Sequence, residues 1–97
     1  MPIQAFEMHR LKQNPQVLFT ELDDGTAVLL HLESKFYFTL NKTAVFIWKT
    51  IGLKEKCSAD EIVDALVQCF HVERPQAEHD VLYLLAEMKA DTLVIDA

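Results

Sequence analysis

The sequence predicts an α+β domain in which a three-stranded antiparallel sheet is followed by three helices. A hairpin signal, Asp24-Gly25, separates two runs that are rich in apolar and β-branched residues. At Asn41 the spacing of apolar residues changes from every second residue to the spacing of a helix. Two further segments with helical spacing follow Gly52.

The first part of the chain divides into a lead-in and a hairpin. Residues 1–16 show no sustained period, so we expect a loosely ordered lead-in, and we expect residues 17–97 to form a single domain. Residues 17–22 and 26–32 are expected to be the two strands of the hairpin, joined by a turn at Asp24-Gly25 that suits positive φ.

A third strand is expected at residues 36–40, after a short turn at Glu33-Ser34-Lys35. Alternation along this strand places three side chains on one side, Phe36, Phe38 and Leu40, and two on the other, Tyr37 and Thr39. If the strands pair in chain order, the third strand lies at an edge of the sheet.

Asn41 is expected to start the first helix, because its side-chain oxygen can accept a hydrogen bond from a free N–H group of the first turn. One face of this helix carries Ala44, Ile47, Trp48 and Ile51. Gly52 follows where a residue in the left-handed conformation often closes a helix.

Two more helices are expected in the second half of the chain. Ser58 and Glu61 have the spacing of a capping box at the start of one helix, and Pro75 suits the first turn of the next. That third helix carries an apolar side made of Ala77, Val81, Leu84, Leu85 and Met88. It is expected to end near Asp91-Thr92, and residues 93–95 are expected to be an extended tail packed on the core.

Composition limits the partners and the compartment. The chain has 97 residues, enough for one modest core, and its fifteen acidic and nine basic residues give a net charge of −6. This charge weighs against nucleic acid and membrane as partners. No signal peptide or membrane span is visible, so we expect a cytoplasmic protein. In the cytoplasm, both Cys57 and Cys69 are expected to be reduced. We expect both thiols to be half-buried, with Cys57 near the solvent edge.

The residues do not indicate catalysis. Cys69-Phe70-His71 and His79 match no common zinc spacing, and no base can be identified for Cys57 as a nucleophile. Two glycines are too few for a glycine-rich phosphate loop, and the carboxylates of the last two helices fit a solvated face. We therefore expect no enzyme activity, no metal and no cofactor.

The edge formed by residues 36–40 leaves alternatives open, because its N–H and C=O groups must be covered, blunted or used. A partner peptide could add to it as a strand. Alternatively, the aromatic residues only close the core, and an N-terminal segment or a neighbouring chain covers the edge. The protein would then be a small structural or regulatory module, which can form a homodimer through this edge. A winged-helix DNA-binding protein is disfavoured, since the third helix offers few basic residues beyond Arg74 and Lys89.

Five segments carry a resemblance to a known family. They are Ala27-Val28-Leu29-Leu30-His31-Leu32, Phe36-Tyr37-Phe38-Thr39-Leu40-Asn41, Thr43-Ala44 with Ile47-Trp48, Ile62-Val63-x-Ala65-Leu66 and Asp80-Val81-x-x-Leu84-Leu85. In these segments the chain resembles the PqqD family, the small proteins of pyrroloquinoline quinone biosynthesis and their relatives. The resemblance covers about residues 15–95, and its most specific part is aromatic-x-Leu-Asn followed by Ile-Trp.

The resemblance implies a fold similar to a winged helix-turn-helix and a non-catalytic role. Such domains bind the leader of a ribosomally made precursor peptide and present it to a modifying enzyme, often a radical S-adenosylmethionine enzyme. The leader adds as a strand beside the third strand, against the third helix. The peptide-binding residues implied here are Lys35, Phe36, Tyr37, Phe38, Thr39, Val81, Leu84, Leu85 and Met88. In two turns where the family often has glycine, this chain has Glu33-Ser34-Lys35 and Asp91-Thr92.

Overall fold

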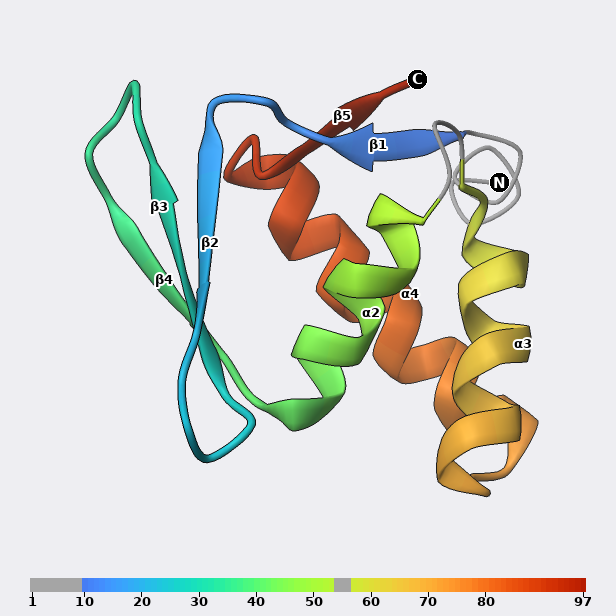
Figure 1. The fold of residues 1–97 in the computed structure, drawn as a ribbon. Coiled ribbons are helices and arrows are strands. Elements are labelled where there is room, and N and C mark those ends of the chain that lie inside the picture. The colour runs from blue at the N-terminus through green and yellow to red at the C-terminus, as the bar shows by residue number, and fades with distance from the viewer. Residues whose placement is uncertain (1–9, 54–56) are drawn as a thin grey trace.

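A computed structural model describes residues 10–53 and 57–97. This part of the chain contains a three-stranded antiparallel sheet, three helices and a second sheet of two strands (Figure 1). The elements in chain order are β1 (Leu11–Gln13), β2 (Val17–Glu21), β3 (Ala27–His31), β4 (Tyr37–Leu40), α2 (Lys42–Gly52), α3 (Ala59–Phe70), α4 (Arg74–Ala90) and β5 (Val94–Asp96). The α+β class and the sheet followed by three helices are therefore confirmed.

The three-stranded sheet has the order β2-β3-β4, which makes β4 an edge strand within the described residues. In the turn between β2 and β3, Gly25 has a φ of 88°, as the hairpin signal predicts. The Asp24 carboxylate accepts hydrogen bonds from the hydroxyl and the N–H of Thr26. These two bonds lower the pKa of Asp24, because they stabilise its charged form.

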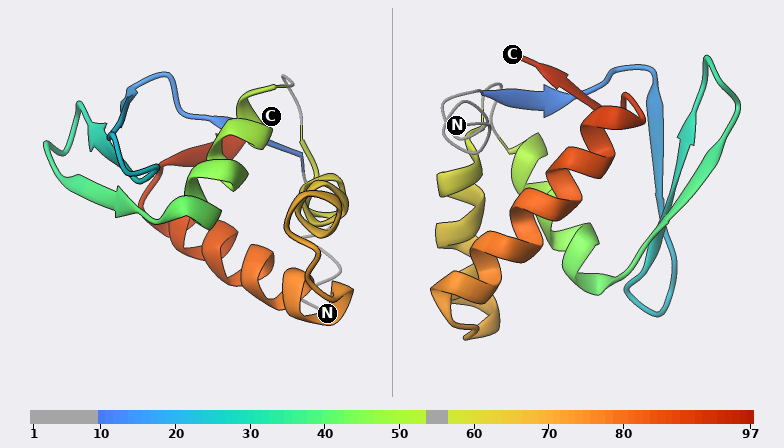
Figure 2. Two further views of the ribbon diagram at one scale, coloured as in Figure 1. Left: turned by 60° about the horizontal axis from the view of Figure 1, so that its bottom comes forward. Right: turned by 180° about the vertical axis from the view of Figure 1, so that it is seen from behind.

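The helices lie to one side of the sheet, with α2 in the middle and α3 and α4 packed against each other (Figure 2). All three expected helix starts are confirmed, with Pro75 in the first turn of α4. The side chain of Asn41 accepts from the N–H of Ala44, and that of Ser58 accepts from the N–H of Glu61. The predicted apolar face of α2 is buried in a core shared by the sheet and all three helices: Ala44, Ile47, Trp48 and Ile51.

Strand β1 was not expected from the sequence. Of the lead-in predicted at 1–16, residues 1–9 lie outside the described residues, whereas Leu11–Gln13 pairs with β5 in an antiparallel sheet. Leu11 also exchanges two backbone hydrogen bonds with Cys57, of 2.8 and 3.0 Å. A strand of three residues is too short to show a period, and its partners lie far away in the sequence.

Three other expectations are wrong. Gly52 is the last residue of α2 and Leu53 is the C-cap residue, so Gly52 does not close the helix in the left-handed conformation. A Cβ atom at Gly52 would lie 2.6 Å from Nε2 of Gln13, so this glycine leaves room for a side chain from β1.

Neither cysteine is half-buried: Cys57 is 1% exposed, within the core, and Cys69 is exposed.

The turn before β4 explains a further difference. Lys35 has a φ of 67°, which redirects the chain immediately before the strand. As a result, Phe36 precedes β4 and is 67% exposed, although alternation placed it on the same side as Leu40, which is buried. Thr92, between α4 and β5, also has a positive φ, of 59°. Both left-handed residues lie in the turns where the resemblance implies glycine.

We expect Thr92→Gly to raise the free energy of unfolding by about 1 kcal/mol, because glycine adopts this conformation without a clash of its Cβ atom. Urea denaturation monitored by circular dichroism measures the change. The control is Thr20→Gly in the regular strand β2, which we expect to be destabilising. Equal effects at the two positions would contradict the assignment of strain to Thr92.

Candidate functional site

Tyr37 and Thr39 present their backbone N–H and C=O groups at the outer edge of β4. In an antiparallel pair of strands, hydrogen-bonded residue pairs alternate with non-bonded ones. The N–H of His31 donates to the C=O of Phe36 at 3.0 Å, and the register places the next bonded pair two residues on, at Phe38. The backbone groups of Tyr37 and Thr39 therefore point away from β3, and no described strand pairs with them.

The turn that leads into this edge is held by a buried histidine. Nδ1 of His31 accepts hydrogen bonds from the N–H groups of Glu33 and Ser34, at 3.2 and 3.4 Å. The N–H of Lys35 donates to the C=O of His31 at 2.8 Å. Because these bonds satisfy the backbone groups of the turn, the position at which β4 begins is fixed.

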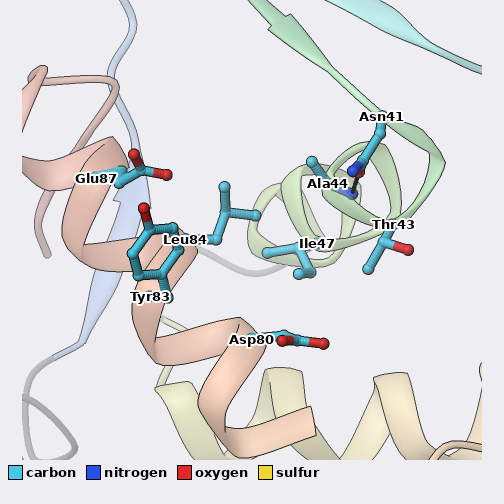
Figure 3. Close-up of a pocket in the computed structure, with 8 residues that line it drawn as sticks. All are labelled: Asn41, Thr43, Ala44, Ile47, Asp80, Tyr83, Leu84 and Glu87. Atoms are coloured by element: carbon cyan, nitrogen blue, oxygen red, sulfur yellow. Dashed lines mark hydrogen bonds between the residues drawn. The ribbon is translucent and has the colours of Figure 1, made fainter. Parts of the chain in front are cut away.

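Two neighbouring hollows lie between β4, the start of α2 and one face of α4. The first has a volume of about 310 Å³ and is lined by Tyr37, Phe38, Thr39, Leu40, Leu84, Glu87, Met88, Asp91 and Leu93. The second has a volume of about 370 Å³ and is lined by Asn41, Thr43, Ala44, Ile47, Asp80, Tyr83, Leu84 and Glu87 (Figure 3). Since Leu84 and Glu87 line both, we call the two hollows together the β4–α4 groove.

The structure separates the four helix residues that were implied as peptide-binding. Leu84 and Met88 line the groove, although Met88 is also buried in the core, and Figure 3 shows Leu84 pointing from α4 toward Ile47 of α2. Val81 and Leu85 have no exposed surface and belong to the core, so they line neither hollow. These two residues support the groove wall from behind.

The strand residues are also divided. Tyr37, Phe38 and Thr39 line the groove next to α4. Lys35 and Phe36 lie in the turn before β4 and line neither hollow. The groove thus begins at the first residue of the strand.

The polar residues of the groove were not predicted from the sequence, because the carboxylates of α4 were assigned to a solvated face. Asp80, Tyr83, Glu87 and Asp91 line the groove together with Leu84. Their positions correspond to i, i+3, i+4, i+7 and i+11, which share one helical face. This spacing is the signal that could have identified them.

The described part of the chain contains no group of three or more His, Cys, Asp or Glu side chains that could hold a metal ion. None of the helices there is long and apolar enough to span a membrane.

Two adjacent leucines test the division between groove and core. We expect Leu85→Ala to lower the free energy of unfolding by about 2–5 kcal/mol, because it leaves a cavity. We expect Leu84→Ala to cost about 1 kcal/mol, since that side chain is already partly exposed. Chemical denaturation of both variants gives the comparison, and similar losses would contradict the assignment of Leu84 to the groove.

This chain is similar to a known protein family and to solved structures of the same fold. The family model described as "Coenzyme PQQ synthesis protein D (PqqD)" matches residues 26–94. A search of curated proteins gave no match. The solved structure of TbiB1 in complex with the TbiA(beta) leader peptide is 31% identical, with a TM-score of 0.76, and the alignment covers 86% of this chain and 93% of that one.

A second solved structure, lasso peptide synthetase B1 complexed with the leader peptide, is 27% identical with a TM-score of 0.74. The alignment covers 88% of this chain and 96% of that one. Both structures share the fold described above. Since the family match spans most of the chain, as the resemblance of the sequence indicated, this protein belongs to the PqqD family.

Proposed function

We propose that this protein is a non-catalytic adaptor, which binds the leader of a ribosomally made precursor peptide in the β4–α4 groove. The observation that carries the proposal is the pair of outward-pointing backbone units, Tyr37 and Thr39, beside a groove lined by both apolar and acidic side chains. A peptide that adds as a fourth strand would satisfy these groups. The two similar solved structures are complexes with leader peptides, which supports this function.

The groove offers apolar contacts to such a strand. Successive side chains of an extended peptide alternate between its two faces, so every second one would point toward α4. Leu84 stands between the two hollows, with Ile47 and Ala44 on the facing helix (Figure 3). An apolar side chain of the leader that fills this position would displace water and anchor the peptide.

Presentation to a separate enzyme completes the proposal. The enzyme that modifies the bound precursor would be another protein, such as a radical S-adenosylmethionine enzyme. The carboxylates of Asp80, Glu87 and Asp91 beside the edge would repel phosphate groups, which favours a peptide over nucleic acid in this groove.

We expect Thr39→Pro to weaken peptide binding by up to about tenfold while the fold is retained. Proline removes the outward-pointing N–H of this residue, and an edge strand tolerates that loss because no described strand accepts this hydrogen bond. Peptides selected from a display library of short random sequences serve as probes. Binding is measured by titration of the ¹⁵N-labelled protein, with amide shifts expected at Tyr37, Thr39, Leu84 and Glu87.

The matched control is Glu21→Pro on β2, the opposite edge of the sheet. Because β3 bonds to β2 through Val28 and Leu30, the backbone groups of Glu21 also point outward. This variant is expected to bind the peptide like the unmodified protein. Binding lost equally in both variants, or shifts confined to other elements, would contradict strand addition at β4. Light scattering of the protein alone detects a homodimer, and loss of the doubled mass when a charge is placed at Thr39 would show that the dimer uses the same edge.

A further inference from the structure

The wall that α4 contributes to the β4–α4 groove is acidic. Asp80, Glu87 and Asp91 line the two hollows, whereas no lysine or arginine does. Glu87 and Asp91 form no ion pair with another described residue. Carboxylates placed beside an open strand edge therefore keep their charge available for a ligand.

The basic side chains of α4 are held away from this wall. Arg74 donates to Asp64 of α3 at 2.6 Å, and Lys89 donates to Asp96 of β5 at 2.7 Å. The pKa of Arg74 is raised, first by its hydrogen bond to Asp64. The positive charges of this helix are thus paired on other sides of it, and the groove remains negative.

An aromatic ring lies among the carboxylates. Tyr83 is 63% exposed and lines the second hollow between Asp80 and Glu87 along the helix. Figure 3 shows its ring next to Glu87 on the same side of α4. A ring face beside two carboxylates suits a guanidinium or ammonium group, which gains from both contacts.

The spacing of the carboxylates fits an extended peptide. Asn41 and Asp80 line one hollow and Tyr37 and Asp91 the other, so β4 and α4 run in opposite directions along the groove. Glu87 and Asp91 are one turn apart, about 6 Å along the helix axis. Alternate side chains of a strand are about 6.6–6.8 Å apart. Two successive groove-facing side chains of an added strand could therefore each meet one carboxylate.

From these observations we infer that the groove selects a cationic peptide, an extended segment with Lys or Arg at two alternate positions that face Glu87 and Asp91. This inference rests on the proposed function, since it concerns the peptide that adds to β4. The net charge of −6 would also steer a cationic segment toward the protein.

Display selection tests the inference. Short random peptides are selected on the intact protein, on the variant Glu87→Lys/Asp91→Lys and on the control Asp23→Lys/Asp60→Lys. The control makes the same change of net charge at exposed positions that line neither hollow. We expect the protein and the control to enrich Lys and Arg at positions i and i+2, and the groove variant to enrich Asp and Glu instead. Circular dichroism verifies that each variant is folded.

A neutral variant gives the size of the effect. With a peptide selected on the unmodified protein, Glu87→Gln/Asp91→Asn should bind about tenfold more weakly at low salt. The difference should shrink as salt screens the charges.

The outcomes separate the inference from the function on which it rests. Selected peptides that shift the amides of β4 but carry no basic bias would overturn the inference alone. A basic bias that persists in the groove variant would also overturn it, since the bias would then come from net charge. Failure to select any peptide that reaches β4 would overturn the proposed function itself.

Discussion

The geometry of the groove depends on Asn41, which ends an edge strand and starts a helix within one residue. Leu40 before it is buried in the core, and Ala44 after it donates its N–H to the Asn41 side chain at 2.8 Å. A shift of β4 by one residue would expose Leu40, bury Thr39 and break this cap. The strand is therefore held in a single register, in which the backbone groups of Tyr37 and Thr39 reach the outer edge.

The opposite wall is positioned by Asn14, which lies at the corner between β1 and β2. Its side chain donates to the C=O of Thr92 at 2.8 Å, and its N–H donates to the C=O of Leu93 at 3.0 Å. The N–H of Val17 donates back to the C=O of Asn14 at 3.0 Å. These bonds offset the cost of the positive φ at Thr92. They also fix the end of α4, and with it Asp91, relative to the sheet.

Local signals predicted most of the fold but only part of the site. The hairpin at Gly25 and the helix start at Asn41 are set by interactions within a few residues, so the sequence displays them. Strand β1 depends on partners far along the chain, which no local pattern reveals. Residues 82–85 are four consecutive apolar residues that cover a full helical turn, so spacing alone could not separate Leu84 in the groove from Leu85 in the core.

An open edge explains capture of a peptide but not the choice of one. Hydrogen bonds to β4 replace bonds to water, so each contributes only about 0.5–1.5 kcal/mol, and any extended backbone can make them. Affinity must come from side chains that fill the hollows on either side of Leu84, because buried anchors dominate binding. Discrimination then depends on what α4 rejects as well as on what it accepts. An acidic side chain of a peptide in this groove would lie beside the unpaired carboxylate of Glu87 or Asp91, which repels it. The same wall that anchors one leader can therefore exclude others.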